Sequence, residues 1–265
     1  MNEIWLQSSF EGELVKYYEK FFYHGKEDLV RQTNEYIKER LVKYVNTDNK
    51  GDSNGMRILD IGCGTGLYEE GLADMFGSIL ALDISDDMVD YAKTNHNREN
   101  CQYEVFDICE KQVASKEFDA AISLSHVIGY QLSNQKLSEY FENIAAALKS
   151  GGVFAFNFYH EPGILCGHLE PKVAECNADG VKIVRHSDVS KLLMENALQL
   201  EYDYDITDEE NLRIRIKERM RYFSFLEIKE YLNRNGMDVL EAVEFLKDKP
   251  LDGSEWNAFI VAGKR

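Results

Sequence analysis

The hydrophobic positions between residues 57 and 158 alternate between two spacings. Segments with apolar residues at helical spacing lie near Tyr68–Met75, Asp87–Lys93 and Lys136–Leu148. Short apolar runs of strand length separate them, and these are Arg57–Ile61, Ser78–Asp83, Cys101–Phe106, Phe118–Ser123 and Val153–Phe156. Strands that alternate with helices predict a parallel sheet with helices on both faces, and therefore the α/β class.

The segments that flank this core follow other patterns. Residues 11–45 carry apolar and aromatic residues at helical spacing, with Gly25 as the expected break. Residues 180–222 read as three long strands without helices between them, which predicts an antiparallel insert. A helix and two strands close the chain. We therefore predict a helical segment at 1–50, an α/β domain at 51–158 and 223–265, and an antiparallel β lid at 159–222.

Three alternate glycines follow the first strand in the segment LDIGCGTG, and a helix comes after them. Glycines at Gly62, Gly64 and Gly66 let the backbone turn tightly and approach a ligand, because a Cβ would collide there. Cys63 lies among them, at a position that tolerates small residues. The spacing GxGxG differs from the GxGxxG of dinucleotide-binding enzymes, which disfavours NAD. Asp60, two residues before the first glycine, is placed to accept hydrogen bonds from an ammonium group.

Acidic residues also end the next two strands. Asp83 closes the segment ILALD, which is the usual place for an acid that binds a ribose diol. Asp107 follows the third strand, where it would meet the exocyclic amine of an adenine. The pattern predicts a nucleotide-like ligand above the sheet.

Residues 57–158 strongly resemble the class I S-adenosylmethionine (SAM) methyltransferases in the segments LDIGCGTG, ALDIS, FD, FDAAISL and LKSGGVFAF. The resemblance implies a Rossmann-like fold with a mostly parallel seven-stranded sheet, SAM as cofactor and S-adenosylhomocysteine as product. It implies that the glycine loop and Asp60 hold the methionine moiety, Asp83 the ribose and Asp107 the adenine. The expected cofactor-binding residues are Asp60, Gly62, Cys63, Gly64, Gly66, Asp83, Ile84, Met88, Asp107, Ile108 and Leu124.

Methyl transfer needs an aligned acceptor, and a base helps only where the acceptor must lose a proton. Aromatic and hydrogen-bonding residues follow the fourth and fifth strands, where ligands of open α/β sheets bind. His160 is the first candidate for a base and His126 the second, although either histidine can instead be a hydrogen-bonded loop residue. The further candidates are Tyr159 and Tyr18 for catalysis, and Tyr130 and Asn157 for acceptor binding.

The N-terminal segments YEKF and GKED resemble the first helix of methyltransferases that act on nucleotide-linked amino sugars, where a tyrosine closes over the cofactor. The segments SHVIGYQ, NFYHEPGIL and RMRYFS resemble a broader group from polysaccharide and secondary-metabolite pathways. NFYH departs from the amino-sugar N-methyltransferases, which tend to carry an acid and tryptophans there. We therefore expect methylation of an amine or a hydroxyl on a small polar metabolite, with a nucleotide-linked sugar first. The alternatives are small-amine or amino-acid N-methylation and a SAM-sensing module without activity.

Charged residues alternate along two neighbouring strands of the lid. The basic row is Arg213, Arg215, Lys217, Arg219 and Arg221, and the acidic row is Glu201, Asp203 and Asp205. A three-residue loop at 208–210 would place Asp205 opposite Arg213, Asp203 opposite Arg215 and Glu201 opposite Lys217. Arg219 and Arg221 then remain for a phosphate or carboxylate of the substrate, with at least one pointing into the site above Gly64.

The formal net charge of −17 argues against nucleic-acid partners, because a phosphate backbone would be repelled. The five cysteines form no CxxC pair, so neither a metal site nor a disulfide framework is expected. Neither a signal peptide nor an apolar run of roughly 18 residues is present. We therefore expect a cytoplasmic enzyme with a small-molecule acceptor and no membrane partner. The oligomeric state stays open, with a homodimer as one option.

Overall fold

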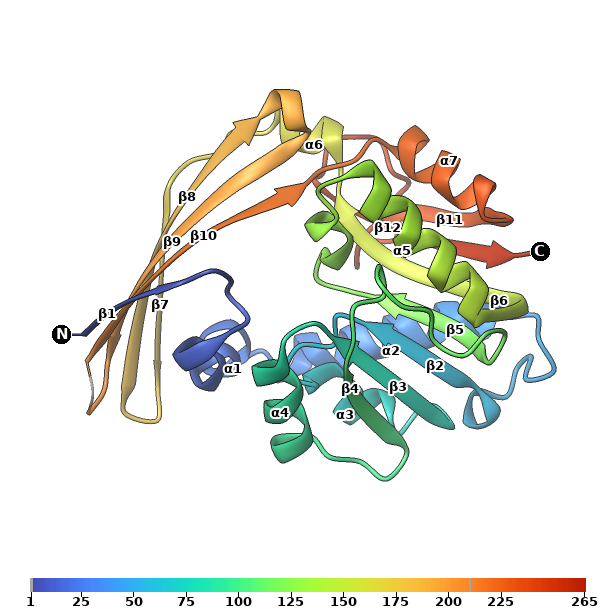
Figure 1. Ribbon diagram of the computed structural model, residues 1–265, viewed down its shortest axis with the longest axis horizontal. Coiled ribbons are helices and arrows are strands. Elements are labelled where there is room, and N and C mark those ends of the chain that lie inside the picture. Colours follow the sequence, from blue (N-terminus) through green and yellow to red (C-terminus); the bar gives the residue numbers. More distant parts are fainter. Residues whose placement is uncertain (1, 210) are drawn as a thin grey trace.

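The computed structural model describes residues 2–209 and 211–265 and contains a large, mostly parallel sheet (Figure 1). Its strands follow the order β11-β12-β6-β5-β2-β3-β4. Strands β2 to β6 run parallel, whereas β12 is antiparallel to both β6 and β11. The bounds are β2 Arg57–Ile61, β3 Ser78–Asp83, β4 Cys101–Val105, β5 Phe118–Ser123, β6 Leu148–Tyr159, β11 Met237–Glu244 and β12 Asn257–Lys264. This arrangement confirms the predicted Rossmann-like α/β fold.

Helices cover both faces of this sheet, as a parallel sheet requires. One apolar cluster packs α5 (Asn134–Ala147) and α7 (Phe225–Arg234) on one face. A second cluster packs α2 (Glu27–Tyr44), the end of α3 (Leu67–Leu72) and α4 (Asp86–Asn95) on the other. Because both faces are covered, β5 is buried along its whole length. Serine side chains accept a backbone amide at the starts of α4, α5 and α7, which sets where these helices begin.

A second sheet, here called the lid sheet, has the order β1-β10-β9-β8-β7. Its strands are β1 Asn2–Leu6, β7 Lys172–Ala178, β8 Val181–Leu192, β9 Ala197–Thr207 and β10 Leu212–Arg221. The strands β7 to β10 are antiparallel neighbours, whereas β1 pairs with β10 in parallel. The sequence analysis did not predict β1, because it gave residues 1–50 to a helical segment. The lid sheet therefore combines one strand from the start of the chain with four strands of the predicted insert.

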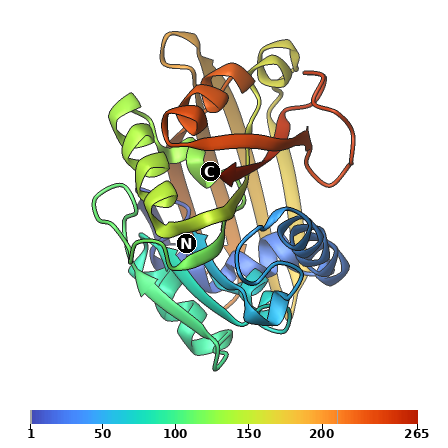
Figure 2. The same cartoon turned by 90° about the vertical axis from the view of Figure 1, so that its right-hand side faces the viewer.

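The lid sheet forms a separate layer that arches away from the α/β domain (Figures 1 and 2). Helix α1 (Val15–Tyr23) lies between the two and contacts both β7 and α4. The remaining helical elements of the described residues are short. They are helix α6 (Glu161–Cys166) and the 3-10 turns Gly12–Leu14, Ser53–Gly55, Val127–Tyr130 and Leu193–Glu195. No helix among the described residues is long and apolar enough to cross a membrane.

The register of the charged hairpin is confirmed. Arg213 pairs with Asp205, Arg215 with Asp203 and Lys217 with Glu201. Glu210, in the loop that we predicted, lies outside the described residues. The charged row is on the outer, partly exposed face of β10, and the alternate apolar residues are buried against α1. Most of the row therefore forms a cross-strand charge ladder.

Candidate active site

A cavity of about 700 Å³ lies at the carboxyl ends of the parallel strands. Its wall includes residues that follow β2, β3, β4 and β5, the aromatic N-terminal segment and part of the lid sheet. The strand order reverses between β2 and β5, and open α/β sheets bind ligands at this reversal. Small-molecule sites commonly measure about 300–1,000 Å³, so the cavity has the size of one.

The glycine loop forms the floor of the cavity. Gly62 and Gly66 have φ of +81° and +82°, and a Cβ on either would come within 3 Å of Val127 or Ala92. Gly64 also has positive φ, at +57°, but an added Cβ would meet nothing within 4 Å. The outer two glycines therefore let the loop pack tightly, while Gly64 leaves its backbone open to a ligand.

Asp83 stands next to this loop, at the end of β3. Its carboxylate accepts the Gly64 amide at 2.8 Å and the Ser85 amide at 2.9 Å. Burial raises its pKa, and these amide hydrogen bonds act in the opposite direction. Asp83 and the following Ile84 both line the cavity. The carboxylate thus faces the ligand side with only backbone partners, as a ribose-binding acid would.

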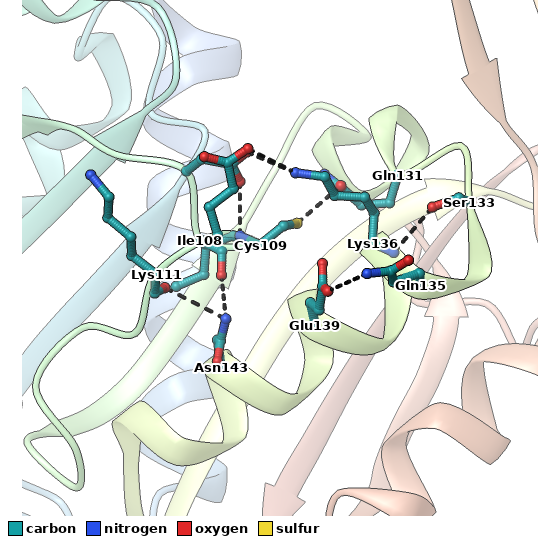
Figure 3. A network of polar contacts seen from close by, with 11 residues as sticks. Ile108, Cys109, Lys111, Gln131, Ser133, Gln135, Lys136, Glu139 and Asn143 are labelled. Atoms are coloured by element: carbon teal, nitrogen blue, oxygen red, sulfur yellow. Dashed lines mark hydrogen bonds and ion pairs between the residues drawn. The ribbon is translucent and has the colours of Figure 1, made fainter.

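Helix α5 holds the loop that follows β4 (Figure 3). Lys136 reaches Asp107 at 3.2 Å, and the Asn143 amide donates to the Ile108 carbonyl at 2.7 Å. Asp107 also accepts the Cys109 amide at 2.8 Å. Asp107 and Ile108 line the cavity, so the structure brings both predicted residues to the same wall as Asp83.

A buried acid that the sequence analysis missed lies beside Asp60. Glu69 on α3 is fully buried and shares a hydrogen bond with Asp60, which is 4% exposed and lines the cavity. Among the described residues no lysine, arginine or histidine forms an ion pair with either carboxyl, so the contact favours a proton that one of the two carboxyls keeps. Burial raises the pKa of Asp60 to about 6 and that of Glu69 well above its usual value.

Aromatic residues of the N-terminal segment form one side of the cavity. Tyr18, a predicted site residue, lines it and packs against Phe22 with ring centroids 4.7 Å apart. Tyr23 lines it too and hydrogen-bonds to Tyr68 and Ser125, which the sequence analysis did not foresee. Of the other predicted residues, Cys63, Leu124 and Tyr130 also belong to the wall.

Gly66 and Met88 are not part of the wall. Gly66 is packed behind the loop, and Met88 is fully buried under it at the start of α4. We predicted that both residues bind the cofactor, and this is corrected. Neither residue lines the cavity, and both pack behind the glycine loop.

His126 is stacked on Tyr159, with ring centroids 4.3 Å apart. Its Nε2 lies 3.0 Å from Oδ1 of Asn257, and its backbone amide donates to Asn157. Burial lowers the pKa of His126 to about 4, so the ring is neutral at neutral pH. The two neighbours of His126 in sequence, Ser125 and Val127, line the cavity. Neither predicted catalytic residue is part of the cavity lining in this structure.

Two predicted roles at the end of β6 need correction. Asn157 is 1% exposed and holds the His126 loop, so it does not face an acceptor. His160 is 4% exposed, packs edge-on against Phe158 and does not line the cavity. A general base must come within hydrogen-bonding reach of the acceptor, which His160 in this position does not. Both residues are structural.

The last two arginines of the charged row, Arg219 and Arg221, lie in different surroundings. Arg219 lines the cavity at its rim, where its guanidinium pairs with Glu195 at 2.8 Å. Arg221 is buried and bonded to Glu227 at 2.6 Å and to Asn134 at 2.8 Å. The predicted substrate role of Arg221 is therefore corrected to a structural ion pair, because this guanidinium is buried and does not line the cavity.

Comparison with known proteins identifies the domain that carries this site. Residues 58–152, from β2 into β6, match the family described as a methyltransferase domain. The chain carries a class I SAM-dependent methyltransferase domain. It is an enzyme domain, and its cofactor is SAM.

Relatives of this methyltransferase differ in the acceptors that their names print. A malonyl-[acyl-carrier protein] O-methyltransferase of Acetivibrio thermocellus is 26% identical over 216 residues, covering 78% of this chain and 71% of that one. The sugar N-methyltransferase KedS8 from Streptoalloteichus has a TM-score of 0.77 at 18% identity, covering 99% and 96%. CalS10, an amino pentose methyltransferase from Micromonospora echinaspora, has a TM-score of 0.74 at 16% identity, covering 98% and 100%. These similarities show the fold and leave the acceptor open.

Proposed function

We propose that this methyltransferase acts on an amine or hydroxyl of a small polar metabolite, with a nucleotide-linked sugar as the leading acceptor class. The observation that carries the proposal is the enclosure of the cavity. The N-terminal segment, through Phe10 and Tyr18, and the lid sheet, through Glu218, both contribute to the wall that faces the glycine loop. A roofed cavity of about 700 Å³ suits a small molecule beside the cofactor better than a folded protein.

The residues present fit the cofactor. Asp83 and Asp107 would hold its ribose and adenine, Asp60 would face its ammonium group, and the open backbone at Gly64 would lie along it. Bound SAM supplies a methyl group that is already activated by a sulfonium. The chain itself has to exclude water and hold the acceptor in line, which is catalysis by proximity.

The wall opposite the cofactor loop is aromatic with a charged rim. Tyr18, Tyr23 and Tyr130 give flat surfaces that suit a sugar ring or a base. Lys217 and Arg219 lie at the edge of the cavity, where they supply positive charge for a phosphate. Each is paired with a glutamate in this structure, so a phosphate would compete with Glu201 or Glu195 for it.

A second candidate is O-methylation of an acyl carboxylate on a carrier protein, which the name of the A. thermocellus relative suggests. The negative charges in the cavity disfavour this acceptor. The acids Asp60, Asp83, Asp107 and Glu218 all line the cavity, and they would repel a carboxylate as the reacting group more than the hydroxyl or amine of a sugar whose phosphates lie at the rim beside Lys217 and Arg219. We therefore rank it below an amine or hydroxyl acceptor.

A methyl-transfer assay with three acceptors tests the proposal. Purified enzyme and SAM are incubated with UDP-glucosamine, with UDP-glucose and with malonyl-[acyl-carrier protein], and mass spectrometry detects the methylated product. We expect methylation of a nucleotide sugar. Methylation of the carrier-bound acyl group alone would overturn the proposal. SAM binding without transfer to any member of a wider panel, including amino acids and simple amines, would favour a sensing module.

A further inference from the structure

An acidic side chain interrupts the apolar inner face of β10. Ile214, Ile216 and Met220 on this face are buried in apolar clusters, and Glu218 takes the position between the last two. Glu218 is 9% exposed and lines the cavity on the side opposite the glycine loop. The charged ladder on the outer face of the same strand cannot explain this acid, because alternate residues of a strand point to opposite faces.

Glu218 is hydrogen-bonded but has no counter-charge. Its two carboxylate oxygens accept the Ser9 hydroxyl at 3.1 Å and the Ser9 amide at 3.4 Å, and Tyr130 also hydrogen-bonds to it. Within residues 2–209 and 211–265, no lysine, arginine or histidine forms an ion pair with it. Burial raises its pKa, and the hydrogen bonds from Ser9 and Tyr130 act against this shift. A buried acid without a cation is costly to keep, so a cation from outside the chain would be favourable there.

Tyrosines lie near the end of β10 that carries this carboxylate. Tyr130, Tyr159 and Tyr202 pack around one apolar cluster that includes Met220, the residue two positions after Glu218. Of the three, Tyr130 hydrogen-bonds to Glu218 and lines the cavity. The Tyr202 ring is already covered by Arg185, which lies 5.1 Å from its centroid. The face of an aromatic ring attracts cations. A tyrosine beside a buried carboxylate that has no ion-pair partner among the described residues has the chemistry of a subsite for an organic ammonium.

We propose that Glu218 is a specificity-determining residue that selects acceptors with a basic nitrogen. Its carboxylate pairs with the ammonium form of the acceptor, and Tyr130 lies beside that group. The nitrogen then gives one proton to the carboxylate, which leaves the lone pair free to react and changes no other bond at Glu218. The inference rests on the proposed function and narrows its acceptor from an amine or a hydroxyl to an amine.

Calorimetric binding of two matched probes tests this assignment. UDP-glucosamine and UDP-glucose differ by an amine in place of one hydroxyl, and S-adenosylhomocysteine is present so that no methyl group is transferred. We expect the wild type to bind UDP-glucosamine about tenfold or more tightly than UDP-glucose. Glu218→Gln should weaken UDP-glucosamine binding by about 10–100-fold and change UDP-glucose binding by less than about threefold, because only the charged hydrogen bond is lost.

Two further variants control for packing. Glu218→Asp keeps the charge and should retain part of the preference for the amine. Glu175→Gln makes the same chemical change at a half-exposed acid of the lid sheet, which pairs with Lys182, and should leave both affinities unchanged. Unaltered S-adenosylhomocysteine affinity would show that each variant is folded.

The outcomes separate this inference from the proposed function. An unchanged amine preference in Glu218→Gln overturns the role of Glu218, and so does equal binding of the two probes by the wild type. If the wild type still methylates a nucleotide sugar in those cases, the proposed function stands. Binding of neither probe, together with methylation of malonyl-[acyl-carrier protein], overturns both.

Discussion

Replacing Glu69 by glutamine should remove a pH dependence that is built into the floor of the active site. Glu69 and Asp60 are buried together, and their contact needs a shared proton. The unfolded carboxyls, with pKa near about 4, hold no proton at neutral pH. The native state therefore binds one more proton than the unfolded state, and the free energy of unfolding falls by about 1.4 kcal/mol per pH unit as pH rises.

The raised pKa values set the pH window. The stability that the shared proton provides is complete below the unfolded pKa and is lost as pH rises through the raised folded pKa values, about 6 for Asp60 and well above the usual value for Glu69. In Glu69→Gln the side-chain amide donates to Asp60 without a titrating proton. From pH 6 to pH 8 the variant should therefore gain stability relative to the wild type, by at most about 1.4 kcal/mol per pH unit.

Urea unfolding at pH 6, 7 and 8 measures this difference. Glu99→Gln, which makes the same change at an exposed acid just before β4, serves as the control and should follow the wild type. Parallel wild-type and Glu69→Gln stability curves over this range would refute the shared proton, whatever the absolute stability of the variant.

Three further outcomes are expected. Asp83→Ala should weaken SAM binding by about 1–3 kcal/mol in calorimetry, because the ribose loses a charged acceptor; an equal dissociation constant would contradict this. His160→Ala should keep turnover and SAM affinity while it lowers stability by about 1–3 kcal/mol, and a large loss of turnover would restore it as a catalytic candidate. His96 lies 2.8 Å from Glu19 on α1 and 3.0 Å from Glu70 on α3, and Glu19 raises its pKa. These two ion pairs of His96 are fully formed below a pH of about 6.5, and they are lost as pH rises through its raised folded pKa. Hydrogen-exchange protection of α1 should therefore fall from pH 6 to pH 9 in the wild type and stay level in His96→Gln.

The fold could be predicted wherever burial leaves a local pattern. The strands β2, β3 and β5 have the bounds that the sequence analysis expected, because strands covered on both faces read as continuous apolar runs that polar turns interrupt. The short strand β1 has no such pattern, because it is an edge strand with the sequence NEIWL and an exposed Trp5. Its partner, β10, is more than 200 residues away in sequence, so no local signal indicates the pairing.

The candidate site residues were likewise predicted correctly where a local pattern marks them, and incorrectly where their position depends on distant strand pairing. The acids Asp60, Asp83 and Asp107 lie at strand ends that the sequence marks, and all three reach the cavity. His160 does not, because the expected strand ended at Phe156 whereas β6 continues to Tyr159. The added residues pair with β12, so Asn157 enters the sheet and His160 is carried past the cavity.

The lid sheet shows why a prominent charge pattern can lead away from the functional face. Its odd-numbered basic row attracted the substrate assignment, yet opposite charges on β9 satisfy most of that row. The even-numbered positions of β10 are apolar except for Glu218, and the period of two places that acid on the inner face. An acid in an otherwise apolar row breaks the local rule, and such positions are where a binding role is expected. The sequence contains this signal, but it does not show which face of β10 is covered. In the structure the even-numbered face packs with Leu14 and Tyr17 of the N-terminal segment.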